Sequence, residues 1–116
     1  MRLRTLPLAL LAALAVVALA GAGTASAKSC SSAKYPGDGY FTSLSVRGTS
    51  CASGKTVQRH HYNCRVRNGG KDGRCNKRVD GYRCSERRNR IPTEINARVS
   101  CRKGSRRVSF TYQQNL

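Results

Sequence analysis

Hydrophobic and polar residues alternate along most of the chain after residue 39, the pattern of strands with one buried face. In 40–47, Leu44 and Val46 share a face with Tyr40 and Thr42, and Gly48 ends the stretch. The same period of two recurs in 79–86, with Tyr82 and Cys84 on one face, in 95–102, and in 108–112. The sequence therefore predicts four strands, with Tyr40 and Tyr82 in the core.

Residues 51–66 follow a helical period instead. Thr49 or Ser50 can cap the start of this helix. The residues that recur at spacings of three or four, and so share one helix face, are Cys51, Gly54, Val57, His61 and Cys64. Glycine costs a helix about 1 kcal/mol relative to alanine. Gly54 therefore suggests that the helix approaches a sheet closely at that point.

The predicted order of elements is β-α-β-β-β. One helix would pack on one face of a mainly antiparallel sheet, which makes a small two-layer α+β domain. Glycine-rich 68–77 and the segment 87–94 are expected to be connections, and Lys103-Gly104-Ser105 a tight hairpin turn. We place a polar N-terminal arm at 28–39, the α+β domain at 40–113 and a polar tail at 114–116.

Residues 1–27 have the composition of a secretory signal. Arg2 and Arg4 precede an unbroken apolar run from Leu8 to Ala20, and Ala25-Ser26-Ala27 is a small-x-small cleavage site. A membrane span needs roughly 20 apolar residues, and this run is shorter. The sequence therefore predicts cleavage before Lys28 and a secreted product that is extracellular or associated with the cell wall.

The remaining 89 residues are strongly basic and poor in aliphatic side chains. Without Arg2 and Arg4, 20 Lys and Arg oppose 5 Asp and Glu, a net charge of +15. Only 12 of these residues are Leu, Ile, Val or Phe, too few for a large core. The size and composition exclude a large multi-step enzyme, a membrane transporter and a cofactor-binding sheet protein.

The cysteines offer the missing stability. All six are expected to form disulfides, namely Cys30, Cys51, Cys64, Cys75, Cys84 and Cys101. The gaps between them are 21, 13, 11, 9 and 17 residues, unlike the close pairs of metal sites, so we expect neither metal nor cofactor. Cys84 and Cys101 could face each other across a hairpin, or each could reach a helix cysteine. We favour at least one bridge between helix and strand.

The stretch from Tyr40 to the C-terminus carries a cysteine scaffold in the segments 44–52, 81–84, 99–104 and 108–110, together with Cys64. It resembles a group of small secreted actinobacterial proteins that share these cysteine positions and have no established activity. The resemblance covers about 75 residues. It implies secretion and disulfides, and it carries over no functional residues.

The positive charge is the main candidate for function. Guanidinium groups suit phosphate and carboxylate, and a body this basic attracts polyanions by releasing their counterions. We predict electrostatic attachment to an extracellular polyanion, either a wall phosphate polymer, an acidic polysaccharide or nucleic acid. A surface whose charge is only compositional is the alternative. The expected anion-binding residues are Arg87, Arg88, Arg90, Arg98, Arg102, Lys103, Arg106 and Arg107.

Two other functions stay open. Loop 87–93, held between Cys84 and Cys101, could be presented to a protease or another protein partner, with Arg90 as its specificity residue. A small secreted nucleic-acid hydrolase is the third hypothesis, with His60 and His61 as weak catalytic candidates. Because no known catalytic motif occurs, we expect no enzyme activity.

Overall fold

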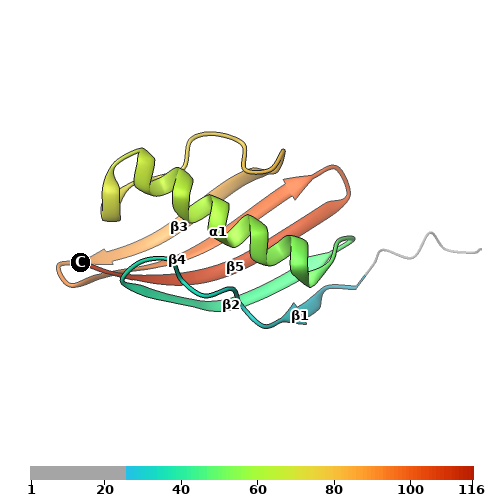
Figure 1. The fold of residues 1–116 in the computed structure, drawn as a ribbon, viewed down its shortest axis with the longest axis horizontal. Coiled ribbons are helices and arrows are strands. Elements are labelled where there is room, and N and C mark those ends of the chain that lie inside the picture. The colour runs from blue at the N-terminus through green and yellow to red at the C-terminus, as the bar shows by residue number, and fades with distance from the viewer. Residues whose placement is uncertain (1–25) are drawn as a thin grey trace, which may run out of the picture.

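One helix lies along one face of a five-stranded antiparallel sheet (Figure 1). The computed structural model describes residues 26–116, so the predicted signal at 1–27 lies almost wholly outside the described residues. The sheet order is β1-β2-β5-β4-β3. The elements are β1 (Lys28–Cys30), β2 (Gly39–Arg47), α1 (Cys51–Arg67), the 3-10 helix η1 (Gly70–Asp72), β3 (Arg83–Ile91), β4 (Glu94–Lys103) and β5 (Arg106–Asn115). This confirms the predicted α+β class.

Helix α1 begins and packs where the sequence indicated. Ser50 is the N-cap and its hydroxyl accepts a hydrogen bond from the Ser53 amide at 3.1 Å. A Cβ added to Gly54 would lie 2.6 Å from a Val46 methyl carbon and 3.3 Å from a Leu44 methyl carbon. Glycine is therefore required for the close approach of α1 to β2.

The inner face of the sheet carries the core. Leu44, Val46 and Val57 pack under the helix. The remaining fully buried apolar residues of the inner face are Ile95, Val99, Cys101, Val108, Phe110 and Tyr112. Tyr82 is also buried, as predicted. The opposite face has no covering layer among the described residues, and we call it the outer face.

The prediction that Tyr40 belongs to the core is wrong. The pairing of β2 with β5 shifts between Phe41 and Ser43, which indicates a β-bulge. The extra residue reverses the alternation on its N-terminal side. Phe41 therefore turns inward, 5.8 Å from Phe110 between ring centroids, and Tyr40 is 62% exposed.

Residues 87–93 do not form the predicted loop. Strand β3 runs through this segment to Ile91 and pairs with β4, leaving only Pro92-Thr93 as the turn. The predicted start of the strand at Val79 is also wrong, because Asp80 and Gly81 form a tight turn with φ of 51° and 80°. Polar sequences can form such an edge strand because one of its faces and its outer edge stay in water.

The predicted arm and tail are parts of the domain. In the arm, β1 pairs with β2, and Ala33 and Tyr35 are buried. The buried side chain of Gln58 accepts a hydrogen bond from the Ala33 amide at 2.8 Å, which holds the arm against α1. In the tail, Gln114 is 1% exposed and accepts a hydrogen bond from the Tyr35 hydroxyl at 2.6 Å. These contacts satisfy polar groups that the sequence alone gave no reason to bury.

The six cysteines form three disulfides, as their number predicted. Cys30–Cys51 joins β1 to the start of α1, Cys64–Cys75 joins the end of α1 to the following loop, and Cys84–Cys101 crosses the β3–β4 hairpin. The cross-hairpin alternative is therefore confirmed for Cys84 and Cys101. A bridge between helix and strand also exists, but it starts from Cys30.

Candidate anion-binding surface and the charged groups around it

Rows of like side chains cross the outer face from strand to strand. In an antiparallel sheet, residues paired in register lie side by side on the same face. One row consists of arginines and the next of serines, followed by a mixed row. Their members are Arg47, Arg107, Arg102 and Arg83, then Ser29, Ser45, Ser109, Ser100 and Ser85, then Ser43, Thr111, Arg98 and Arg87.

The arginines of this face oppose one another and no acid opposes them. Arg107 pairs in register with both Arg47 and Arg102, Arg102 pairs with Arg83, and Arg98 pairs with Arg87. These six arginines form no ion pair with any described residue. Like charges directly opposite each other in a sheet are destabilising, so the fold keeps this arrangement at a cost.

Four of the chain's five acids are used elsewhere. Asp38, Asp72 and Asp80 contact Lys71, Arg90 and His60 respectively, in the segments that border α1. Glu86 turns inward, as described below. Only Glu94, at the far end of β4, shares the outer-face side of its strand with Arg98 and Arg102.

A small pocket lies at one edge of the outer face, between β2 and β5. It has a volume of about 220 Å³ and is lined by Arg47, Arg107, Ser45 and Ser109, with Ala27 beside them. The Nε of Arg47 is buried and has no hydrogen-bond partner among the described residues. Two guanidiniums and two hydroxyls give this pocket donors for an anionic group.

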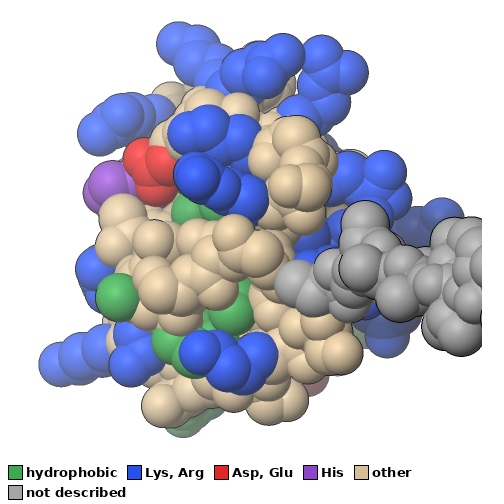
Figure 2. Space-filling view, turned by 90° about the vertical axis from the view of Figure 1, so that its right-hand side faces the viewer, with side chains coloured by type: hydrophobic (Ala, Val, Ile, Leu, Met, Phe, Trp, Pro, Cys, Tyr) green, Lys and Arg blue, Asp and Glu red, His purple; other side chains and the backbone are tan. Residues whose placement is uncertain are grey.

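The eight predicted anion-binding residues fall into three groups. Arg87, Arg98, Arg102 and Arg107 lie on the outer face. Lys103 and Arg106 lie at the β4–β5 turn, where Lys103 reaches over the Tyr82 ring. Figure 2 views the molecule from this end, where Lys and Arg side chains project in several directions. Arg88 and Arg90 are paired with acids instead: Arg88 is nearly buried beside Glu86, and the half-exposed Arg90 pairs with Asp72.

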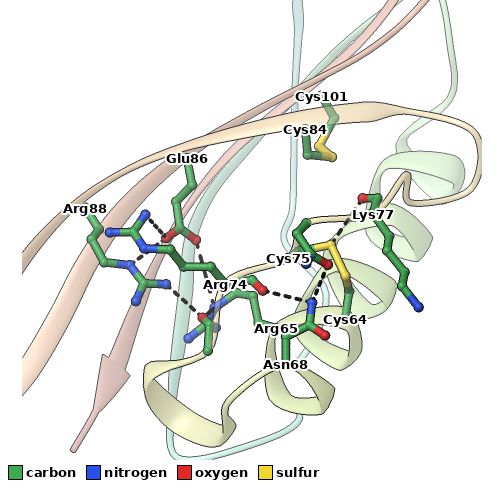
Figure 3. The surroundings of a disulfide bond; sticks show 12 residues. Cys64, Arg65, Asn68, Arg74, Cys75, Lys77, Cys84, Glu86, Arg88 and Cys101 are labelled. Carbon is green, nitrogen blue, oxygen red and sulfur yellow. Dashed lines mark hydrogen bonds and ion pairs between the residues drawn. A yellow bond between two sulfur atoms is a disulfide. The ribbon is translucent and has the colours of Figure 1, made fainter.

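Arg88 belongs to a group of side chains between the sheet and α1, which we call the Glu86 cluster: Arg65, Glu86, Arg88 and Tyr112. Figure 3 shows the first three of them. Arg88 Nε donates to Glu86 Oε2 at 2.6 Å, and the Tyr112 hydroxyl donates to Glu86 Oε1 at 2.5 Å. Arg65 Nε lies 3.9 Å from the same carboxylate. One carboxylate therefore serves two nearly buried guanidiniums.

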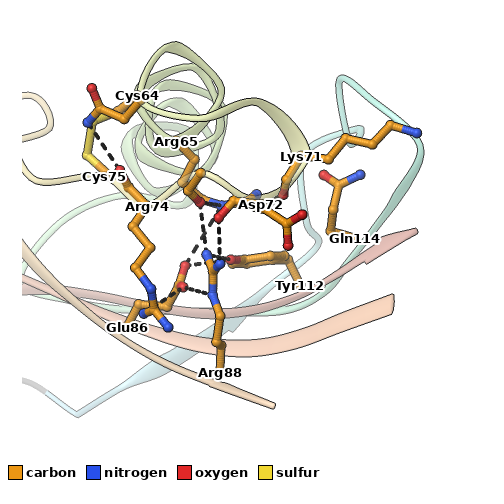
Figure 4. Close-up of polar contacts among 12 residues, drawn as sticks. Cys64, Arg65, Lys71, Asp72, Arg74, Cys75, Glu86, Arg88, Tyr112 and Gln114 are labelled. Atoms are coloured by element: carbon orange, nitrogen blue, oxygen red, sulfur yellow. Dashed lines mark hydrogen bonds and ion pairs between the residues drawn. A yellow bond between two sulfur atoms is a disulfide. The ribbon is translucent and has the colours of Figure 1, made fainter. Parts of the chain in front are cut away.

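Backbone carbonyls of the loop after α1 complete the cluster (Figure 4). Arg65 donates to Gly73 O at 3.2 Å and to Lys71 O at 2.8 Å, and Arg88 donates to Asp72 O at 2.8 Å and to Gly73 O at 2.9 Å. The Arg65 guanidinium also stacks 4.2 Å over the Tyr112 ring. The cluster thus fixes the loop against the sheet. Arg90 is held nearby by Asp72, at 2.7 Å.

The electrostatics of the cluster follow from these contacts. Burial alone would raise the pKa of Glu86, but the hydrogen bonds from Arg88 and Tyr112 and the charges of Arg88 and Arg65 lower it overall. Burial and the hydrogen bond to Glu86 raise the pKa of Tyr112. Glu86 is therefore ionised and Tyr112 protonated at neutral pH.

The two histidines lie in different environments. His61 is 2% exposed and packs edge-on against Phe110, with ring centroids 5.3 Å apart. Burial lowers the pKa of His61 to about 4, so this side chain is neutral and sealed from solvent. His60 is exposed, and its Nδ1 lies 2.7 and 2.8 Å from the two carboxylate oxygens of Asp80. The two side chains therefore do not form one site.

His60 lines a pocket of about 400 Å³ between the second half of α1 and the segment 77–80. Arg67, Lys77 and Arg78 line the same pocket, together with Asn63, Asn68 and Asp80. We call this the His60 pocket. It lies on the helix side of the sheet, so it is separate from the outer face.

Two features of the interior were missed by sequence reasoning although their patterns were present. Arg65 follows Val57 and His61 at spacings of four, which places it on the buried helix face. The alternation that puts Tyr82 and Cys84 inward also continues to Glu86 and Arg88. Charged residues are seldom buried unless paired, so neither pattern by itself indicates burial.

Comparisons of the chain with family models, with curated proteins and with solved structures give no match. Within residues 26–116, no three His, Cys, Asp or Glu side chains are grouped closely enough to hold a metal ion. No helix in this part of the chain is long and apolar enough to cross a membrane.

Proposed function

We propose that this chain is a secreted, non-enzymatic protein that attaches to extracellular anionic polymers through the outer face of its sheet. The observation that carries this proposal is the row Arg47, Arg107, Arg102 and Arg83, in which each arginine lies beside another and none is neutralised by an acid. A bound polyanion would remove the repulsion within the row. The rows present their charges on a single sheet face, which suits an extended chain of phosphate, sulfate or carboxylate groups.

Secretion is part of the proposal. The signal-like composition of residues 1–27 and three disulfides support an oxidising compartment. The serine row, which lies between the arginine row and the mixed row, adds hydroxyl donors on short side chains. An anionic chain could therefore approach the backbone of the sheet between the flanking arginines.

Salt dependence and matched variants test the proposal. The probe is duplex DNA. The logarithm of its binding constant falls linearly with the logarithm of the salt concentration, with a slope of about −0.9 for each phosphate that is neutralised. We expect Arg98→Gln combined with Arg102→Gln to make this slope shallower by about 2 and to weaken binding about tenfold at about 50 mM salt. The control combines Lys34→Gln with Arg59→Gln, two exposed cations that lie outside the sheet strands, one between β1 and β2 and one on α1.

The control loses the same net charge, so it should weaken binding no more than about threefold, through the general field of the protein. Equal weakening in both double variants would show that binding does not depend on the outer face. A wild-type binding constant that does not change with salt would reject electrostatic attachment altogether. Repeating the titration with poly(glycerol phosphate) and a sulfated polysaccharide then ranks the polymer classes.

The two alternative functions have less support. A presented reactive loop at 87–93 would need an extended loop, whereas this segment is paired with β4 except for its two-residue turn. A hydrolase using both histidines would need them in one site, whereas His61 is buried on the sheet-facing side of α1. Cleavage of RNA by the wild-type protein at any pH from about 4 to 9, lost in His60→Ala, would contradict the non-enzymatic proposal.

A further inference from the structure

The His60 pocket carries features that attachment through the outer face does not use. The imidazole ring of His60 is held in place because its Nδ1 contacts both carboxylate oxygens of Asp80, at 2.7 and 2.8 Å. This leaves Nε2 as the atom of the ring that is free to meet a ligand, and it has no hydrogen bond to any described residue. The side chain is half exposed, at 49%.

The walls of the pocket are fixed before any ligand arrives. Asp80 lies in the tight turn that Val79 and Tyr82 close with two backbone hydrogen bonds of 2.9 and 2.7 Å. Asn68 Nδ2 donates to Arg74 O at 3.1 Å and to Asn76 Oδ1 at 2.7 Å, which holds the segment leading to Lys77. The Cys64–Cys75 disulfide fixes the same segment to α1. A preformed pocket loses little conformational entropy on binding.

The charge of the pocket favours an anion. Arg67, Lys77 and Arg78 provide three positive charges, and the only acid in the lining is Asp80, whose two oxygens already face His60. None of these three cations forms an ion pair within residues 26–116. The pocket is concave and small, so it suits one compact group rather than an extended polymer.

We propose that the His60 pocket binds a single tetrahedral oxyanion, the phosphate or sulfate group of a small ester, and that protonation of His60 strengthens this binding. Arg67, Lys77 and Arg78 supply charge, and His60 Nε2 supplies a directed donor once the ring is protonated. This site is independent of the outer face, because Arg67, Lys77 and Arg78 do not lie on that face.

The expected pH dependence follows from the groups that face His60. They are Asp80, Lys77 and Arg78 from the segment 77–80, Arg67 from α1, and Lys103 from β4, which donates to Asp80 O at 3.4 Å. Of these groups and His60 itself, histidine is the type that changes charge between pH 5 and 8. Affinity for the oxyanion should therefore rise as the pH falls through this interval.

The test uses the full secreted chain labelled with ¹⁵N and titrated with sodium sulfate at constant ionic strength. Sulfate is the probe because its charge is constant between pH 5 and 8, unlike that of phosphate. We expect saturable amide shifts in 60–68 and 77–80, and an affinity at least threefold higher at about pH 5.5 than at about pH 8. His60→Gln should abolish this pH dependence.

Matched variants separate the pocket from general charge. Arg78→Gln should weaken sulfate binding at least fivefold, whereas Arg59→Gln, on the same helix side but outside the lining, should change it less than twofold. The outer-face variant Arg102→Gln should also leave it unchanged. Non-saturable shifts, equal effects of Arg78→Gln and Arg59→Gln, or the same pH dependence in His60→Gln would each overturn the proposal.

Glycerol phosphate and a monosaccharide sulfate distinguish the two sources of the oxyanion. Tighter binding of the first would identify phosphate esters, and tighter binding of the second sulfate esters. If neither ester competes with inorganic sulfate, the proposed ester site is wrong. Failure here would leave the polymer-binding proposal standing, because that proposal is measured by outer-face variants and a different ligand.

Discussion

The Glu86 cluster and the outer face are both built from arginines, yet they differ in every other respect. Inside, Arg65 and Arg88 share one carboxylate and donate to the carbonyls of a single loop. Outside, Arg102 and Arg107 face each other with no counter-charge. Arg87 and Arg88 are neighbours in sequence and belong to opposite regions. The side of the strand, rather than the type of residue, decides whether an arginine stabilises the fold.

This difference separates the two roles of charge in a small chain. The Glu86 cluster connects α1, the loop after it and β3 with β5 across a region where few aliphatic side chains are present. Buried ion pairs of this kind add little more stability than apolar packing would. Removing one partner, however, leaves an unpaired charge in the interior. The arginines of the outer face form no such stabilising contacts. A bound anion would relieve the repulsion between them.

The largest effect is expected from removing the carboxylate of the cluster. Glu86→Gln keeps the shape of the side chain and leaves Arg65 and Arg88 without their counter-charge. We expect the free energy of unfolding to fall by about 3 to 5 kcal/mol, the usual cost of an unpaired buried charge. Urea unfolding of the oxidised protein, followed by circular dichroism, measures this loss.

The matched control is Glu94→Gln, which removes the same charge from a residue without an ion pair among the described residues. It should change stability by less than about 0.5 kcal/mol, because this half-buried carboxylate lies on the outer-face side of β4 and leaves no buried cation unpaired when it is removed. Similar losses in the two variants would mean that net charge, rather than the geometry of the cluster, sets the stability.

A second, smaller effect concerns His61, which packs beside the cluster. Its pKa is lowered from 6.5 to about 4 by burial. The unfolded chain therefore binds a proton more readily than the folded one, and stability is lost as the pH falls from about 6.5 to about 4. At about 1.4 kcal/mol per pKa unit, the loss amounts to about 3 kcal/mol.

Urea unfolding between about pH 7 and pH 5 isolates this contribution, because the lowered pKa values of Glu86 and Asp72 place their losses at more acidic pH. His61→Phe should flatten the dependence of stability on pH in this range, whereas His60→Gln should keep it. The quantity compared between the variants is the slope of the free energy of unfolding against pH, rather than the free energy at one pH. An unchanged slope in His61→Phe would show that His61 is accessible to protons in the folded protein.

The sequence predicted the outer face better than the interior. The period of two in β4 and β5 was sufficient to place Arg98, Arg102 and Arg107 on one solvent-facing side. The helix, its cap and the role of Gly54 also followed from local patterns. These features depend on residues close together in sequence, where geometry is set by the backbone.

The Glu86 cluster could not be predicted in the same way. Burying Arg65 depends on Glu86, on Tyr112 and on the carbonyl of Gly73, which lie far apart in sequence or belong to the backbone. Nothing in the composition of 87–91 shows that a strand rather than a loop continues there. The His60 pocket depends likewise on a turn at Asp80 meeting α1 across 20 residues.

The smallest effect tests the outer face as a source of repulsion. Arg102 has an arginine beside it on each neighbouring strand, Arg83 and Arg107. Arg102→Gln should therefore raise the free energy of unfolding by about 0.5 kcal/mol at low salt, and high salt should remove the gain by screening. The matched control is Arg59→Gln, an exposed arginine on α1 with Thr56 as its hydrogen-bond partner, which should give no gain.

A loss of stability in Arg102→Gln at low salt would show that the row is already compensated within the chain. We expect Arg102→Gln to raise stability, and the double variant that contains it to bind the polyanion more weakly. Both results together would show that the arginines that bind the polyanion also lower the stability of the fold.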